Sequence, residues 1–196
     1  MTDPVLKGAG DSECGARLNH RPDQTALEAC ARLLRALNAQ ALRLAELHGW
    51  RVDRSPTAWV SYSPGVIQVA PDETLDADDT LLQIVLHEWC HHLVEGPESA
   101  GLADWGLDNE TDADVAHEHA ALRFQAWLTS QWGLRWVLVP TTDFRPWYEQ
   151  LPENPLDGED ESSTMAGAAI GRWQTWPHRA EIESILTIAH NRAGLD

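Results

Sequence analysis

The sequence is poor in basic residues, and lysine is almost missing. Its 196 residues include 14 lysines and arginines against 31 aspartates and glutamates, the formal net charge is −17, and Lys7 is the one lysine. A surface of this charge repels phosphate backbones and anionic membranes, so we expect neither nucleic acid nor a membrane as a partner. A basic or neutral partner is easier to accommodate, although the acidity can equally serve only to keep the protein soluble.

Cysteine is also scarce, at Cys14, Cys30 and Cys90. An odd and sparse set of this kind does not make a disulfide framework, and it indicates a reducing compartment. The N-terminus has neither the charged start nor the apolar stretch of a signal peptide. No run of about eighteen apolar residues is present that could cross a membrane. The expected location is therefore the cytoplasm.

The length and the apolar content of 43% predict a globular chain with one core. We expect residues 1–21 to form a flexible lead-in and residues 22–196 to form a single domain. Within that domain, residues 141–178 carry prolines and the acidic run DGEDESS, which predict a long loop region.

Hydrophobic periodicity and end signals predict the regular elements. Asp23 is a helix cap and Gly49 a helix stop, and the two strands before residue 71 are joined by a short turn of the hairpin type. Helices and strands together predict an α+β fold. The expected helices cover residues 23–49, 79–95, 109–133 and 178–191, and the expected strands cover 58–62, 66–70 and 134–140.

The stretch LHEWCHHLVEG, residues 86–96, contains the pattern H-E-x-x-H. On a helix, His87 and His91 lie one turn apart on one face, where both imidazoles can reach one cation. Glu88 is offset and can hold a water instead of becoming a ligand. Because the surrounding helix is apolar nearly all round, it belongs in the interior, and burying these polar groups is costly unless a metal ion compensates them. The alternative is a pair of hydrogen-bonded core histidines.

A catalytic metal site of this kind needs a third protein ligand. The position six residues after the second histidine is Pro97, so a third histidine there is excluded, and we expect a carboxylate on the following helix. Glu118 and Glu110 compete for this role, and we favour Glu118 because it precedes the apolar half of that helix. Glu110 opens ETDAD, which resembles the Glu-x-x-Ala-Asp signature of gluzincin peptidases and implies that Asp114 supports a ligand histidine. Asp104 is a further candidate near the site.

Two histidines and a carboxylate suit either Zn(II) or Fe(II) as one divalent metal cofactor. With zinc, Glu88 takes the proton of an activated water and the reaction is hydrolysis of a peptide or amide bond. With iron, the open positions serve dioxygen and substrate, and Glu88 orients water or a substrate amine. Tyr148, His119 and His178 are the candidates for a second group near the substrate, although each is more readily explained as structural.

The sequence resembles gluzincin-type zincins broadly and the bacterial elongation factor P hydroxylase family more closely. The second resemblance covers residues 66–146 and rests on HEWCH, on Gly96, on LADWG (102–106), on the distance from Glu118 to Gly133, and on DFRP (143–146). It implies a zincin-like, minimal gluzincin core, in which a small mixed sheet packs on the H-E-x-x-H helix and a glutamate-bearing helix. It also implies iron- and oxygen-dependent hydroxylation of a lysine-derived side chain on a translation factor.

Three functions are therefore open at this point. The first is an iron-dependent protein hydroxylase, the second is a zinc peptidase or amide hydrolase acting on a protein or peptide, and the third is a non-catalytic protein whose metal only holds the fold.

Overall fold

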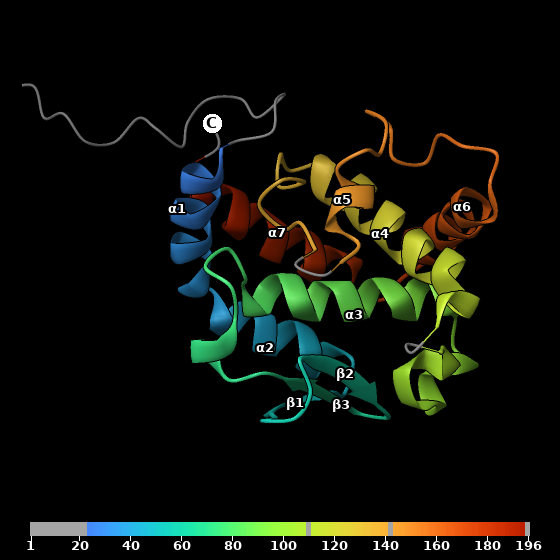
Figure 1. Cartoon of the computed structure of the whole chain (residues 1–196), viewed down its shortest axis with the longest axis horizontal. Coiled ribbons are helices and arrows are strands. Elements are labelled where there is room, and N and C mark those ends of the chain that lie inside the picture. Colours follow the sequence, from blue (N-terminus) through green and yellow to red (C-terminus); the bar gives the residue numbers. More distant parts are fainter. Residues whose placement is uncertain (1–22, 109–110, 141–142, 195–196) are drawn as a thin grey trace, which may run out of the picture.

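The computed structural model describes residues 23–108, 111–140 and 143–194. These residues form an α+β fold, as expected, with seven α-helices and one mixed sheet of three strands (Figure 1). The predicted lead-in 1–21 and the competing ligand Glu110 lie outside the described residues. The α-helices are α1 (Gln24–Arg35), α2 (Asn38–Leu47), α3 (Leu81–Glu95), α4 (Val115–Ser130), α5 (Arg145–Tyr148), α6 (Glu161–Gln174) and α7 (Arg179–Ala193).

The single helix expected over residues 23–49 is two helices in the structure. Asp23 caps α1 by accepting a hydrogen bond of 2.8 Å from the N–H of Ala26, as expected. The chain then turns at Leu37, whose N–H donates to the carbonyl of Leu34 at 2.7 Å, and Leu37 itself is buried. Because of this break, α1 packs on α7 while α2 packs on α3. The apolar side chains that the sequence spaces as one helical face therefore contact two different helices.

The sheet contains β1 (Arg51–Arg54), β2 (Val60–Ser63) and β3 (Val66–Val69) in the order β1-β3-β2. The β2–β3 hairpin confirms the prediction, and its strands are antiparallel. The parallel strand β1 was not expected, because RVDR is short and charged and its pairing with β3 is non-local. The strand β2 therefore lies at an edge of the sheet.

Helix α3 runs through the centre of the molecule, with α2 and the sheet on one side and α4, α5 and α7 on the other (Figure 1). Thr80 caps it by accepting from the N–H of Gln83 at 3.1 Å, and Gly96, with a φ of 85°, ends it. Most of its side chains are buried, as its apolar composition predicts. The motif histidines are thus carried on the most enclosed helix of the fold.

The prediction of a strand over residues 134–140 is wrong. The chain there forms tight turns, in which the N–H groups of Val137 and Leu138 both donate to the carbonyl of Leu134. Its apolar side chains, among them Leu138 and Val139, are buried in the core. A short buried run of β-branched and leucine residues has the same composition in either conformation, so the pattern could not separate them.

The prediction of a long loop over residues 141–178 is also wrong. It contains α5 and the longer helix α6, whose cap Asp160 accepts from the N–H of Ser163 at 2.8 Å. The acidic run therefore begins a helix. Small buried side chains such as Ser162 and Ala166 let α6 pack closely on α4, while Gly167 and Gly171 weaken the helical signal in the sequence.

The remaining helices agree broadly with the expectations. The helix expected over 109–133 is the short 3-10 turn η4 (Asp112–Asp114) followed by α4, and the helix expected over 178–191 is α7. Across the described ranges, none of these helices combines the length and the apolar character needed to cross a membrane. Two further 3-10 turns, η2 (Ser99–Gly101) and η3 (Ala103–Gly106), follow α3, and η1 (Asp72–Thr74) precedes it.

Candidate metal centre

Helices α3 and α4 bring His87, His91 and Glu118 together. The Nε2 atom of His91 lies 2.9 Å from Oε2 of Glu118, and the Nε2 atom of His87 lies 3.2 Å from Oε1 of the same carboxylate. One ligand atom from each residue lies within 4.8 Å of the others. Glu118, the favoured of the two competing glutamates, therefore stands opposite both histidines, because α4 packs on α3 at this point.

The distances from the two Nε2 atoms to the carboxylate are compatible with one ion bound among them. Ligand atoms at the usual zinc distances are about 3.3 Å apart, close to the separations between each Nε2 and the carboxylate. The proton positions give a second argument. Nδ1 of His87 faces Oε1 of Gln125 at 2.9 Å while its Nε2 faces Glu118, so both ring nitrogens face acceptors. Such an arrangement needs either a doubly protonated ring or a cation between Nε2 and the carboxylate.

The electrostatics around the cluster favour positive charge. Burial lowers the pKa of His91, but the Glu118 carboxylate, together with Glu95 and Glu88, outweighs it and raises that pKa to about 10. In the same way burial raises the pKa of Glu118, yet His87 and His91 hold it well below its usual range. The two imidazole rings are 4.8 Å apart, so two protonated rings would repel each other. One divalent ion in place of the two Nε2 protons supplies the same charge without that repulsion.

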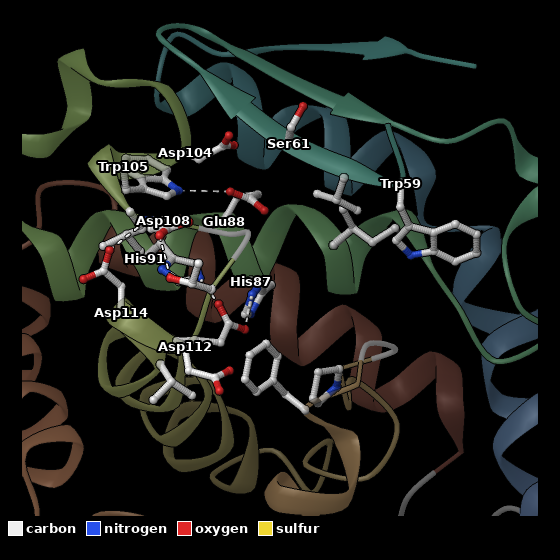
Figure 2. Close-up of a pocket in the computed structure, with 18 of the residues that line it drawn as sticks. Trp59, Ser61, His87, Glu88, His91, Asp104, Trp105, Asp108, Asp112 and Asp114 are labelled. Carbon is white, nitrogen blue, oxygen red and sulfur yellow. Dashed lines mark hydrogen bonds and ion pairs between the residues drawn. The ribbon is translucent and has the colours of Figure 1, made fainter. Parts of the chain in front are cut away.

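Glu88 lies next to the cluster on α3 and takes no part in it. Its side chain is 7% exposed, and its Oε2 accepts a hydrogen bond of 3.0 Å from the indole Nε1 of Trp105 (Figure 2). Trp105 in turn stacks on Tyr62 of β2, with ring centroids 3.8 Å apart. Glu88, which the sequence analysis expects to hold a water, is thus held in place by Trp105 from a separate loop.

That loop has an unusual backbone. Asp104 and Trp105 have φ values of 44° and 61°, and Gly106 follows with 83°. Residues other than glycine rarely occupy this left-handed region, and such strain persists where the surroundings impose it. Oδ1 of Asp104 accepts from the N–H of Tyr62 at 2.8 Å, which ties the loop to the sheet edge. Asp104, a candidate near the site, therefore holds the loop that carries Trp105 and is not in the ligand cluster.

Sequence reasoning missed two neighbours of the motif histidines, a hydrogen-bond partner of His87 and a longer ionic contact of His91. Gln125 accepts from Nδ1 of His87, and Oε1 of Glu95 lies 3.9 Å from Nδ1 of His91. The other oxygen of Glu95 pairs with Nδ1 of His117 at 2.7 Å. Helical spacing carries a weak signal for both, because Glu95 follows His91 by one turn and Gln125 follows the glutamate ligand by about two turns.

Asp114, which was expected to support a ligand histidine, contacts the backbone of Asp108 instead. Oδ2 of Asp114 accepts a hydrogen bond of 2.7 Å from the N–H of Asp108, so it orders the chain before α4. The resemblance implied that Asp114, just before α4, supports a ligand histidine. In the structure the side chains next to the two histidines are Gln125, further along α4, and Glu95, at the end of α3.

The three candidates for a substrate-side group make contacts of their own within the fold. Tyr148 is fully buried, donates to the carbonyl of Arg135 at 2.9 Å, and has a pKa raised by burial. His119 stacks on Trp147 with ring centroids 3.6 Å apart, and His178 lies in an aromatic cluster with His48. None of the three is among the residues that line the cavity at the metal centre.

A cavity of about 310 Å³ opens onto the cluster between α3, the start of α4 and the edge strand β2. Its volume is in the range of small-molecule and side-chain binding sites. Among the described residues, its lining contains no lysine or arginine. The carboxylates that line it belong to Glu88, Asp104, Asp108, Asp112, Asp114 and Glu118, and the aromatic side chains to Trp59, Trp105 and Phe144.

No protein-family model, curated protein or solved structure matches this chain.

Proposed function

We propose that this chain is a metal-dependent enzyme with a zincin-like core, in which His87, His91 and Glu118 hold one divalent ion. The observation that carries the proposal is the position of one carboxylate opposite the Nε2 atoms of two histidines whose Nδ1 atoms face other oxygens. Histidines that are buried only for packing each need their own hydrogen-bond partner. Here the Nε2 atoms of both rings instead point at the same carboxylate, as the ligands of one ion do.

The reaction that this geometry supports best is hydrolysis of a peptide or amide bond. A bound zinc ion would supply a Lewis acid that activates water and polarises the carbonyl. Oε2 of Glu88 is held by the Trp105 N–H, which leaves Oε1 to accept a proton from water in the cavity. The same carboxyl group can then return that proton to the leaving amine. Trp105 keeps the carboxylate in place during both transfers.

The lining of the cavity supports a basic side chain of a protein or peptide as the group bound beside the metal. The carboxylates there attract a cation, and among the described residues the only basic side chains in the lining are His87 and His91, which the ion is proposed to occupy. Trp59, which is 40% exposed, and Phe144 offer aromatic faces to the same cation.

A second candidate is iron-dependent hydroxylation of a lysine-derived side chain on a protein such as a translation factor. The observation that favours it is the role of Leu102–Gly106. This stretch carries much of the resemblance to the elongation factor P hydroxylase family, and it supplies the Trp105 contact to Glu88. In this reaction Glu88 would orient water or a substrate amine.

Metal analysis of protein purified without tags or chelators, followed by refilling with zinc or iron, tests the proposal. The zinc form is assayed on a library of basic peptides for cleavage, and the iron form for the mass gain of one oxygen atom. Glu88→Gln should keep the metal and lose activity, His87→Ala should lose the metal, and Glu46→Gln, at an exposed position of α2, should change neither.

The outcomes separate the functions. Zinc with cleavage that depends on Glu88 supports the hydrolase, and iron with oxygen incorporation supports the hydroxylase. Full activity of Glu88→Gln would remove both mechanisms. Metal binding without either activity would leave the non-catalytic function, and full metal content in His87→Ala would refute the ligand assignment.

A further inference from the structure

We infer that Gln125 is a positioning residue of the metal centre, because it fixes which nitrogen of His87 is available to the ion. The inference rests on the proposed function and concerns the same site. Gln125 is fully buried on α4, and its side-chain amide lies between His87 of α3 and the turn that follows α4.

The orientation of the amide follows from its second contact. Nε2 of Gln125 lies 2.7 Å from the carbonyl oxygen of Leu138, which can only accept a hydrogen bond. The NH₂ group must therefore face Leu138, and the amide oxygen must face Nδ1 of His87 at 2.9 Å. A flipped amide would place two oxygens against each other on one side and two donors on the other.

The amide oxygen then sets the tautomer of His87. An acceptor opposite Nδ1 requires a proton on Nδ1, so in the neutral ring the lone pair lies on Nε2. Nε2 is the nitrogen that faces Oε1 of Glu118 at 3.2 Å. When an ion takes the place of the proton on Nε2, Gln125 holds the one remaining ring proton on Nδ1 and fixes the plane of the ring at the same time.

The Leu138 carbonyl is itself held in place, which makes the arrangement rigid. The N–H of Leu138 donates to the carbonyl of Leu134 at 2.9 Å, and both side chains are fully buried. The tight turn over residues 134–138 thus presents a fixed acceptor to the amide. A strand in this place would have directed its carbonyl groups to a neighbouring strand.

A neutral amide is also the residue type that this position accepts. A carboxylate would place a second oxygen opposite the Leu138 carbonyl in a fully buried site, where two unshared acceptors repel. The other ligand histidine differs, because Nδ1 of His91 faces the carboxylate of Glu95 at 3.9 Å. Among the described residues Nδ1 of His91 has no hydrogen-bond partner, so the fixed hydrogen bond on Nδ1 distinguishes His87.

Zinc affinity of the full chain, measured by competition with a chelator, tests this role. Gln125→Leu keeps the volume and removes both hydrogen bonds, and it should bind zinc about 10- to 100-fold more weakly than the natural chain. The matched control is Gln40→Leu, the same change at a half-buried position of α2, which should leave the affinity unchanged. A Gln125→Leu protein that is folded and binds zinc within about threefold of the natural chain overturns the inference.

A measurement on the natural chain keeps the test decisive if Gln125→Leu fails to fold. In zinc-loaded protein labelled with ¹⁵N-histidine, the His87 ring, assigned by its loss in His87→Ala, should carry its proton on Nδ1. A proton on Nε2 overturns the inference. If the natural chain binds no zinc at all, the proposed metal centre itself fails, which is a different result from equal binding by the natural and Gln125→Leu chains.

Discussion

The indole Nε1 of Trp105 donates a hydrogen bond of 3.0 Å to Oε2 of Glu88, from a loop whose backbone is left-handed at the tryptophan. The strain of that conformation is held by two contacts with β2, the stacking of Trp105 on Tyr62 and the hydrogen bond from the Tyr62 N–H to Asp104. The edge strand thus positions, through Trp105, a carboxylate on α3.

We expect Trp105→Phe to lower the rate of the metal-loaded enzyme about 10- to 150-fold without loss of metal. Phenylalanine keeps a ring against Tyr62, but Glu88 loses a hydrogen bond worth about 1.5 to 3 kcal/mol to a charged acceptor. Rate and metal content are measured on the same preparation. The matched control is Trp132→Phe, which removes an indole hydrogen bond to Thr187 far from the cavity and should leave the rate unchanged. Equal rates for both variants would contradict a positioning role for Trp105.

We expect removal of the metal to lower the melting temperature by about 5 to 10 °C. An ion that binds only the folded chain stabilises it by about 2.7 kcal/mol at 100 times its dissociation constant, and each kcal/mol corresponds to about 2 to 4 °C for a chain of this size. Calorimetry with chelator and with added zinc measures the shift. His91→Ala should melt at the same temperature in both conditions, and a zinc-dependent shift in that variant would place the bound ion elsewhere.

Stability should fall as the pH drops below 6.5, partly because of His48. Burial, assisted by the neighbouring His92 and His178, lowers the pKa of His48 from 6.5 to about 4. Between these values the unfolded chain binds a proton that the folded chain does not, so this contribution is complete above pH 6.5 and is lost toward pH 4.

Urea unfolding of the natural chain and of His48→Phe at pH 7.5 and 5.5 measures this contribution. The natural chain should lose about 1 kcal/mol more than the variant between the two pH values, since other titrating groups are common to both. Equal losses would show that the His48 pKa is not lowered in the folded state.

Replacement of Arg123 should be among the most destabilising changes outside the metal centre. This arginine, 5% exposed, donates to the carbonyls of Pro155 and Asp157, to Ser162 and to the cap Asp160. Arg123→Met leaves these acceptors without a donor, and we expect a loss of about 2 to 4 kcal/mol in the free energy of unfolding. Urea unfolding measures it, and Arg192→Met, at an exposed position of α7, is the control that should not change the midpoint.

Local patterns predicted the parts of the fold that depend on near neighbours. The cap Asp23, the β2–β3 hairpin and the helical face shared by His87 and His91 all depend on residues a few positions apart. Errors arose where one pattern fits two structures. Residues 134–140 are apolar because they are buried, and a helix break at Leu37 leaves the periodicity on both sides intact.

Read alone, the sequence determined the chemistry available at the centre, because two histidines one turn apart and a glutamate on the next helix follow from helical spacing and burial. Only the tertiary structure decided how these groups are held. The crossing of α3 and α4 aims Glu118 at both rings, the turn after α4 offers the Leu138 carbonyl to Gln125, and the edge strand positions Trp105 on Glu88. Each of these contacts joins segments far apart in the chain, where no periodicity links one residue to the other.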